Sequence, residues 1–328
     1  MGHKTVLVTG GAGYVGSHAC AALAQAGYQP VVYDNLSRGH EWAVKFGPLE
    51  VGDIMDSARL AEVFARHKPV GVMHFAAHSF VGESVTDPAI YYRNNVYGSL
   101  NLLQSMIAAD VRKIVFSSTC AVYGIAETVP LTEKLPLAPV NPYGASKWMV
   151  ERILADFAAA YGLTYAALRY FNAAGGAPDL GIGEAHDPET HLVPLVLDAA
   201  AGKRKSITIF GIDYPTPDGS CIRDYIHVLD LASAHIAALE RLVDGAAPMT
   251  INLGNGAGYS VREVIAAAEQ VTGRRVPVEI GPRRAGDPPT LIADASHARS
   301  LLGWIPQRPA IATQLQDAWS WHQQHHLR

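Results

Sequence analysis

A tyrosine and a lysine four positions apart are the residues in this sequence best suited to chemistry. Tyr143 and Lys147 follow Asn141-Pro142, a pair typical of a helix start, so both side chains are expected on one helix face. An ammonium group beside a phenol favours the phenolate and lowers the pKa of the phenol. A phenol tuned in this way can take a proton from an alcohol and return it. The pair therefore predicts acid–base catalysis by Tyr143, with Lys147 beside it.

Hydroxyl side chains precede this pair at the end of a predicted strand. Ser117, Ser118 and Thr119 follow an apolar run, and ligands of parallel sheets bind at the carboxyl ends of the strands. We expect Thr119 to orient the substrate hydroxyl and to relay its proton. Ser117 and Ser118 are expected to be ordinary polar residues of a strand end.

A glycine-rich turn near the N-terminus predicts a dinucleotide site. Residues 9–16 read TGGAGYVG and stand between a short apolar run and a helix-like segment. Gly10 permits the tight turn, Gly13 lets the backbone approach a pyrophosphate, and Gly16 lets the helix pack against the strand. The free N–H groups of the helix start then favour a phosphate.

Two acidic residues downstream bear on the choice of cofactor. Asp34 ends the second predicted strand, where a carboxylate accepts hydrogen bonds from ribose hydroxyls and repels a 2′-phosphate, so NAD is favoured over NADP. Arg38 argues the other way, because an arginine can pair with a phosphate. Asp53 has two interpretations: it accepts from the adenine amino group, or it serves a local turn or cap near Ser57.

The framework that must hold these residues is an alternation of strands and helices. Apolar runs predict strands over residues 5–8, 29–33, 70–75, 113–117 and 163–170, and Ala/Leu-rich stretches predict helices over 17–26, 59–67 and 143–161. This rhythm is typical of an α/β fold with a doubly wound parallel sheet of the Rossmann type. We assign residues 1–172 to an NAD-binding domain.

The second half of the chain has a looser pattern. Helices are expected over residues 192–201, 228–243, 261–271 and 296–302, separated by stretches rich in Gly, Pro and Asp. We assign residues 173–328 to a smaller, mixed α/β substrate lobe. The boundary is soft, and some strands are expected to be exchanged between the lobes.

Composition excludes several classes of protein. With 49% hydrophobic and 17% charged residues, the 328-residue chain has the material for a large core, and its net charge of −4 argues against nucleic-acid binding. Cys20, Cys120 and Cys221 lack the spacing of a disulfide framework or a zinc site, so each is expected to be buried and apolar, and no metal ligand is assigned. We expect neither a signal peptide nor a membrane span, and a cytoplasmic location.

Motifs spread over nearly the whole chain carry a resemblance to a known family. The first half has TGGAGYVG at 9–16, DNLS at 34–37, GD at 52–53, FAA at 75–77, VGES at 81–84, YYRNN at 91–95, SST at 117–119, VYG at 122–124, the Tyr143/Lys147 pair and RYFN at 169–172. The second half has IFG at 209–211, DYPT at 213–216, RDYIHV at 223–228 and RAGD at 284–287. With these motifs the chain resembles the extended short-chain dehydrogenase/reductase superfamily and, within it, the UDP-glucose (UDP-galactose) 4-epimerase family.

The resemblance implies an isomerase that epimerises UDP-glucose and UDP-galactose reversibly at C4, through a 4-keto intermediate and with tightly bound NAD. Its implied catalytic residues are Tyr143, Lys147 and Thr119. Its implied cofactor contacts are Gly10, Gly13, Tyr14, Val15, Gly16, Asp34, Asn35, Leu36, Ser37, Asp53, Ile54, Phe75, Ala76, Ala77, Asn94, Tyr143, Lys147, Tyr170 and Phe171. Its implied contacts with the UDP-sugar are Thr119, Tyr143, Asn172, His191, Leu192, Thr208, Phe210, Arg223, Arg284, Asp287 and Leu291.

The chemistry of the second set agrees with that assignment. Guanidinium groups such as those of Arg223 and Arg284 suit a diphosphate, and the carboxylate of Asp287 suits a ribose diol. The resemblance also implies a homodimer, for which the predicted helices over 99–109 and 148–159 are candidate faces.

Three positions depart from the pattern of some family members. Ser79 replaces a lysine near the nicotinamide side, and His191 replaces an asparagine. Leu291 stands where a bulky tyrosine excludes an N-acetyl group, so a 4-epimerase of another UDP-sugar (UDP-N-acetylglucosamine, UDP-xylose/arabinose or UDP-glucuronate) is the alternative. Cys120 and Ala121 after Thr119 disfavour a dehydratase. A non-catalytic NAD sensor, the rival of another class, commonly lacks the tyrosine or lysine that this chain keeps.

Overall fold

A parallel sheet organises the larger part of the molecule. The computed structural model describes residues 4–284 and 286–326. Within these ranges seven strands run in the order β13-β6-β5-β4-β1-β2-β3, all neighbours parallel. Their bounds are β1 Thr5–Thr9, β2 Gln29–Asp34, β3 Leu49–Val51, β4 Gly71–His74, β5 Lys113–Thr119, β6 Thr164–Tyr170 and β13 Met249–Leu253. The order reverses between β1 and β4, so the predicted doubly wound α/β fold is confirmed.

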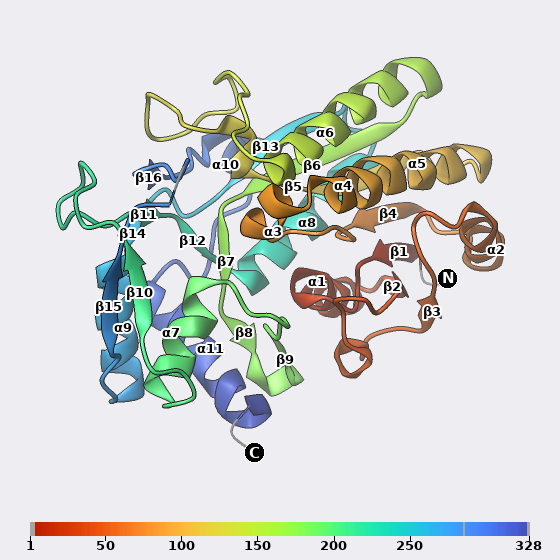
Figure 1. Cartoon of the computed structure of the whole chain (residues 1–328). Coiled ribbons are helices and arrows are strands. Elements are labelled where there is room, and N and C mark those ends of the chain that lie inside the picture. The colour runs from red at the N-terminus through yellow and green to blue at the C-terminus, as the bar shows by residue number, and fades with distance from the viewer. Residues whose placement is uncertain (1–3, 285, 327–328) are drawn as a thin grey trace.

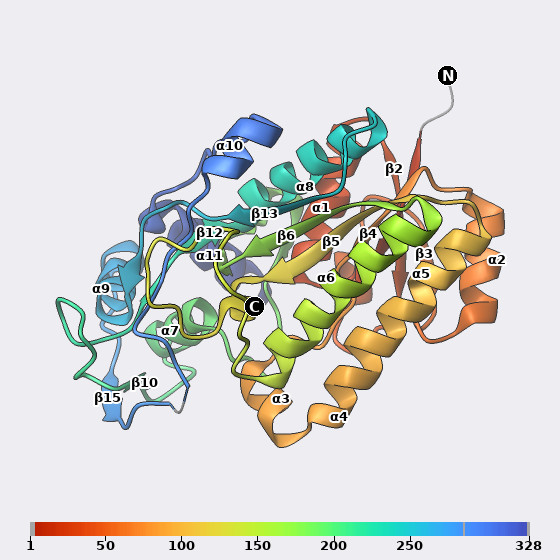
Figure 2. The same cartoon turned by 90° about the horizontal axis from the view of Figure 1, so that it is seen from above.

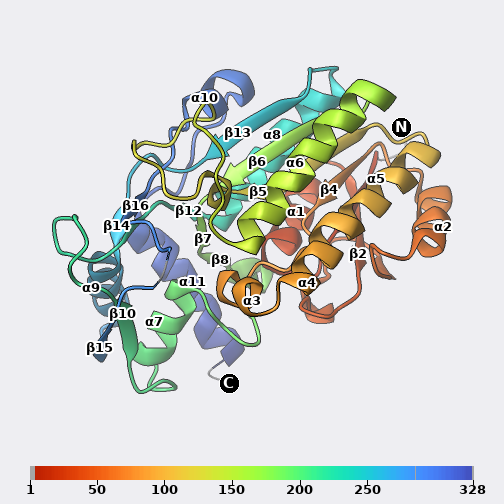
Figure 3. The ribbon, with the colours of Figure 1, turned by 45° about the horizontal axis from the view of Figure 1, so that its top comes forward.

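Helices cover both faces of this sheet, which explains why the central residues of most of its strands are apolar on both faces. On one face α1 (Tyr14–Gln25) and α8 (Val228–Val243) pack on side chains such as Val8 and Val115. On the other face α2 (Ser57–His67), α5 (Ser99–Ala108) and α6 (Pro142–Tyr161) pack on side chains such as Ile114. Figures 2 and 3 show α5 and α6 running side by side along the sheet. Strands buried on both faces cannot alternate with polar residues.

A second core lies beside the carboxyl end of the sheet (Figure 1). Here α7 (Leu192–Ala200), α9 (Val261–Thr272) and α11 (Ile311–His326) pack around residues such as Val196, Val264 and Leu315, next to the parallel pair β10 (Ile207–Phe210) and β15 (Val278–Gly281). The helix α11 was not among the predicted helices. None of the helices in the described ranges has the length and apolarity needed to cross a bilayer.

Short strands connect the two cores. β12 (Tyr225–His227) pairs with β7 (Asn172–Ala174), and β11 (Ile222–Arg223) lies between β14 (Tyr259–Ser260) and β16 (Thr290–Leu291). β13 returns from the second half of the chain to the edge of the large sheet. The remaining elements are α3 Val81–Thr86, α4 Pro88–Tyr91, the π-helical turn η2 Tyr92–Gly98, β8 Gly176–Ala177, β9 Ile182–Gly183, α10 Ser296–Leu302 and the 3-10 turns η1 Glu41–Ala43, η3 Cys120–Tyr123 and η4 Pro178–Leu180. The domain boundary at residue 172 stays a prediction.

Candidate active site

The glycine-rich turn joins β1 to α1 at the carboxyl edge of the sheet. Gly10 has φ +74°, and a Cβ there would run into the backbone of Ala76 after β4. A Cβ on Gly16 would collide with the carbonyl of Gly10, so the helix sits against the turn only because both positions lack a side chain. Gly13 is the N-cap of α1 and places the first N–H groups of the helix at this edge. The turn therefore fits the pyrophosphate of a dinucleotide.

Asp34 lies across the turn at the end of β2. Its carboxylate is almost fully buried and accepts from the backbone N–H of Ala12 at 3.0 Å and of Leu36 at 2.9 Å, while burial raises its pKa. One bond per oxygen leaves further lone pairs for ribose hydroxyls. Arg38, which could have paired with a 2′-phosphate, donates instead to Glu83 at 2.7 Å.

Asp53 is held mainly by local contacts. It accepts from the N–H of Met55 at 2.8 Å and from the amide of Asn35 at 2.9 Å, and the N-cap of α2 is Asp56 rather than Asp53. The local-turn interpretation thus has direct support. A contact from Asp53 to adenine stays a prediction.

The predicted cofactor residues after β4 and on the π-helical turn face the same edge. Phe75 and Ala76 donate their N–H groups to the carbonyl of Thr9 at 2.8 and 3.0 Å, which fixes the segment that continues into Ala77. In η2, Asn94 donates to Asn95 at 3.0 Å, and Asn95 donates to Ser146 on α6 at 3.1 Å. Asn95 is buried and was not predicted as a site residue, although it ties the cofactor side to the catalytic helix.

The predicted catalytic pair lies in the first turns of α6. Asn141 is the N-cap and accepts from the N–H of Gly144 at 2.8 Å, and proline occupies the first turn, as the sequence predicted. Lys147 is buried on the inner face of α6, where its Nζ donates to the carbonyl of Ser117 at 2.8 Å. Tyr143 lies near Thr119 and Tyr170 on the neighbouring strands.

The predicted effect of Lys147 on Tyr143 is not found in the protein alone. Removal from water and the nearby hydroxyl of Tyr170 raise the pKa of Tyr143 above its usual value, and the hydrogen bond with Thr119 opposes this only in part. Burial also lowers the pKa of Lys147 to about 7, against the favourable effect of Glu151. A partly neutral amine directed at Ser117 cannot stabilise a phenolate strongly. In the protein alone desolvation therefore dominates, and the effect of Lys147 on Tyr143 in the loaded site stays a prediction.

A buried charged network beneath the pair escaped the sequence analysis. Arg169 on β6 donates to Glu151 on α6 at 2.9 and 2.5 Å, and both side chains are over 90% buried. Ser118 donates to the same carboxylate at 2.5 Å, so it has a structural role as expected for a strand-end hydroxyl. Arg169 also donates to Tyr123, whose hydroxyl donates to Asn252 on β13. The network joins the catalytic helix to three strands.

Ser117 and Tyr170 share a hydrogen bond of 2.6 Å next to Lys147. Burial raises the pKa of Tyr170 to about 12, so this hydroxyl is protonated at neutral pH. Phe171 follows and packs with Cys120 and Leu291 in a small apolar cluster.

Several predicted substrate residues lie on or beside the short strands β7, β10, β11 and β16. Arg223 on β11 donates to Asp287 at 2.5 Å and lies in register with Leu291 on β16. The guanidinium of Arg284 stacks on the ring of Phe210 at 4.0 Å, and Thr208 precedes that ring on β10. Asn172 lies on β7 in register with Tyr225, while Ala285 of the RAGD motif lies outside the described residues.

Two of these placements differ from the simple expectation. Asp287 already holds Arg223, so a ribose would have to share its carboxylate. His191 directly precedes α7, which begins at Leu192, but its Nδ1 lies 2.7 Å from Glu184. His191 belongs to a cluster with Glu184, His186 and Glu189 that the sequence analysis did not assign, although the spacing Glu-x-His-x-x-Glu-x-His is readable at 184–191.

Comparisons with known proteins agree with this geometry. The model of the NAD dependent epimerase/dehydratase family matches residues 6–254. The chain is 52% identical to a UDP-glucose 4-epimerase of Rhizobium meliloti (strain 1021), over 98% of each chain. It is similar to the crystal structure of a UDP-glucose 4-epimerase from Brucella ovis in complex with NAD, with 50% identity, a TM-score of 0.94 and coverage of 96% and 97%. A Bifidobacterium longum UDP-glucose 4-epimerase in complex with NAD+ and UDP has 39% identity, a TM-score of 0.92 and coverage of 98% and 99%.

Proposed function

The chain belongs to the NAD dependent epimerase/dehydratase family, and from this premise we propose that it is an NAD-dependent enzyme that interconverts UDP-glucose and UDP-galactose. One observation carries the proposal: relatives about half identical along nearly their whole length are UDP-glucose 4-epimerases. The local geometry agrees with it, because Tyr143, Thr119 and Lys147 lie together at the carboxyl edge of the sheet that also carries the dinucleotide turn. Fold and local geometry thus support the same chemistry.

The proposed proton transfer runs through Tyr143. NAD, when bound, would supply reversible hydride transfer at C4 of the sugar. Tyr143 takes the proton of the 4-hydroxyl and gives it back, and Thr119 orients that hydroxyl. Because the protein alone raises the pKa of Tyr143, ionisation of the phenol depends on positive charge that arrives with the oxidised cofactor. Tyr143 is therefore active only in the loaded enzyme.

Inversion at C4 requires the keto sugar to present its other face while it stays bound. We propose that Arg223 and Arg284 hold the diphosphate and that Phe210 lies against the uridine side. Arg223 is kept in place by Asp287 and Arg284 by the ring of Phe210, so both guanidinium groups are oriented before substrate arrives. Binding energy at the nucleotide then keeps the reacting end in the site.

Purified protein given UDP-galactose without added NAD tests the function. Formation of UDP-glucose is expected, and UDP-N-acetylgalactosamine, UDP-xylose and UDP-galacturonate define the range of sugars accepted. Turnover of none of these would refute the assignment, whereas turnover of one other sugar alone would correct the substrate. Leu291 bears on which sugars are accepted, because a larger side chain there would occupy space beside Phe171.

We also propose a homodimer through the outer faces of η2 and α6. Tyr97 is 55% exposed, and Trp148 and Met149 on α6 are about 40% exposed, which makes an apolar patch that another copy can cover. Light scattering should give twice the chain mass, and Trp148→Glu should give the monomer. Ile305→Glu is the control, since Ile305 is also an exposed apolar residue but lies after α10. A cytoplasmic location fits the free, buried state of all three cysteines.

A further inference from the structure

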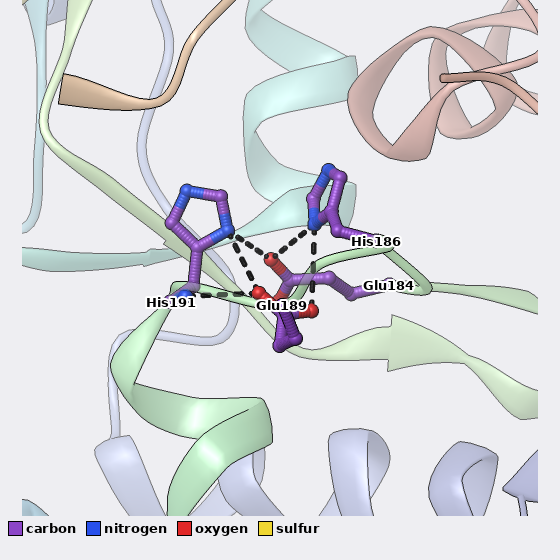
Figure 4. Close-up of side chains that lie close together, drawn as sticks. All are labelled: Glu184, His186, Glu189 and His191. Carbon is purple, nitrogen blue, oxygen red and sulfur yellow. Dashed lines mark hydrogen bonds and ion pairs between the residues drawn. The ribbon is translucent and has the colours of Figure 1, made fainter. Parts of the chain in front are cut away.

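Four metal-ligating side chains converge in the loop between β9 and α7. Glu184, His186, Glu189 and His191 each direct one ligand atom toward a common centre (Figure 4), and these atoms all lie within 4.8 Å of one another. The loop is irregular, yet it brings two imidazoles and two carboxylates together from eight consecutive residues. Such a donor set is one that Zn²⁺ uses in proteins.

The spacing of the ligand atoms fits a small tetrahedral site. His186 Nδ1 lies 3.3 Å from a Glu184 oxygen and 3.5 Å from the Glu189 oxygen that faces it. Bonds of about 2.0–2.1 Å to a tetrahedral Zn²⁺ place neighbouring ligands about 3.3–3.4 Å apart. His191 Nδ1 lies closer to Glu184, at 2.7 Å, so this distance would widen by about 0.6 Å around an ion.

The hydrogen-bonding state of the imidazoles is the second observation. Among the residues that the structure describes, neither Nδ1 atom meets an acceptor with the alignment of a hydrogen bond, although both atoms are buried and carboxylate oxygens are close. His186 Nδ1 lies between the two carboxylates, whereas His191 Nδ1 lies closest to Glu184. Buried polar atoms without a partner are uncommon and call for an explanation such as an ion.

The carboxylates are preorganised for the same centre. Glu184 is 6% exposed as a side chain and Glu189 is 14% exposed, so both carboxylates are largely buried, whereas the side chain of His191 is 41% exposed. One oxygen of Glu189 accepts from the N–H groups of Thr190 and His191, each at 2.8 Å, which fixes the carboxylate and leaves the other oxygen toward His186.

We propose that Glu184, His186, Glu189 and His191 bind one divalent transition-metal ion, Zn²⁺ in the first instance, in a structural site. Four protein ligands close the coordination sphere, which is the arrangement of structural rather than catalytic zinc. The charges also balance, because two carboxylates neutralise the ion and the imidazoles are neutral when ligated.

The position of the site suggests what the ion would hold together. The loop touches the cofactor side through the ring of His40, 2.6 Å from the carbonyl of Ala185, and through Arg38, which donates to the carbonyl of Asp187. The ring of His186 also meets Tyr14, in the first turn of α1, edge-on. On its other side the loop runs into α7. An ion here would fasten the substrate side of the molecule to the dinucleotide turn.

Metal analysis of the purified holoenzyme is the first test. After dialysis against a chelator and then against Zn²⁺, about one ion per chain should remain, and Co²⁺ should give the visible absorption of a tetrahedral site. His186→Ala and Glu189→Gln should each lose the Co²⁺ spectrum and weaken binding at least 100-fold, with circular dichroism and NAD content unchanged. The matched control is His297→Ala, since His297 also has a buried Nδ1 and lies 3.6 Å from Glu133 outside the cluster.

Thermal unfolding with and without Zn²⁺ is the second readout, and it separates an ion site from a cluster of ion pairs. Zn²⁺ should raise the Tm of the parent chain and of the His297→Ala variant, and not that of the His186→Ala variant. A Co²⁺ spectrum that survives in His186→Ala belongs to other histidines and overturns the proposal. Failure of the parent chain to retain an ion, with destabilised cluster variants, would identify ion pairs only and overturn it as well.

Discussion

The catalytic edge of the sheet and the loop before α7 both bury charged side chains, but they treat them in opposite ways. At the catalytic edge, Glu151 and Arg169 satisfy one another with two aligned hydrogen bonds on adjoining elements of regular structure. In the loop, His186 and His191 lie at ion-pair distance from carboxylates without aligned hydrogen bonds. A network whose donors and acceptors are all paired has none left for a ligand, whereas a network with unpaired donors or acceptors can bind one.

The difference indicates where each region acts. The charged pair beneath α6 holds the helix that carries Tyr143 and Lys147, and touches no substrate itself. In the second half, Arg223 with Asp287 and the cluster of the loop keep donors or acceptors that a ligand can use. Substitutions should therefore cost stability in the first network and ligand affinity in the second group.

Tyr143→Phe should have the largest effect, and on chemistry alone. Removing the hydroxyl eliminates the proposed acid–base group, so kcat should fall by about 10²–10⁴ while the fold and the bound NAD remain. Initial rates with UDP-galactose, together with the NAD content of the variant, measure this. Tyr91→Phe is the matched control, because it removes a hydroxyl that bonds to Phe80 and Glu83, on a ring that lies edge-on beside that of Tyr143. Equal losses in the two variants would show that Tyr143 has no special role.

Glu151→Leu should have the next largest effect, and on stability. The change leaves Arg169 buried without its carboxylate, which typically costs about 3–5 kcal/mol in the free energy of unfolding. Urea denaturation measures it. The double variant Glu151→Leu/Arg169→Met should recover most of the loss, since Tyr123 keeps its bond to Asn252. If the single variant is as stable as the parent, the network does not hold α6 and the contrast with the loop fails.

Arg223→Gln should affect binding by a smaller amount. A charge-assisted bond to the diphosphate contributes about 1.5–3 kcal/mol, so KM for UDP-galactose should rise by about 10- to 100-fold with little change in kcat. Arg283→Gln is the control, because Arg283 pairs with Asp213 on the exposed rim. A lower kcat at unchanged KM would place Arg223 in the chemistry rather than in the tether.

Local patterns could be predicted from the sequence because their residues are close in the chain. The dinucleotide turn, the cap of α6 and the ranges of α8 and α10 depend on neighbours within a few positions, and the predicted ranges of these two helices match the structure. Helix α11 was missed because Gln and His dominate its sequence, although Ile311, Leu315 and Trp319 repeat at helical spacing on its buried face.

The buried networks could not be predicted because they depend on register between distant elements. Ser118 and Arg169 are cross-strand partners on β5 and β6, and only this pairing brings both to Glu151. The cluster at 184–191 is local in sequence, but an irregular loop decides which way each side chain points. The pKa of Tyr143 in the protein alone could not be predicted for a related reason, since desolvation depends on everything packed around a group and not only on its helical neighbour.

Replacing Lys147 with Met should give the smallest of these effects, one that depends on pH. Burial lowers the pKa of Lys147 to about 7 in the folded chain, whereas an unfolded lysine has a pKa of about 10.4. Between these values the unfolded state binds one proton more than the folded state, so this group makes stability increase with pH. Below about pH 7 both states are protonated and the full cost of burying the charge is present.

The Lys147→Met variant should therefore be more stable than the parent at pH 6.5, and its advantage should shrink by about 1–2 kcal/mol by pH 8.5. Urea denaturation of nucleotide-free protein at both pH values measures the difference, and Lys113→Met on the partly exposed start of β5 should give none. A constant advantage would mean that Lys147 keeps its charge in the folded state. The catalytic edge would then hold a permanent cation beside Tyr143. The contrast between an edge whose buried charges are paired and a loop whose groups lack aligned hydrogen bonds would no longer stand.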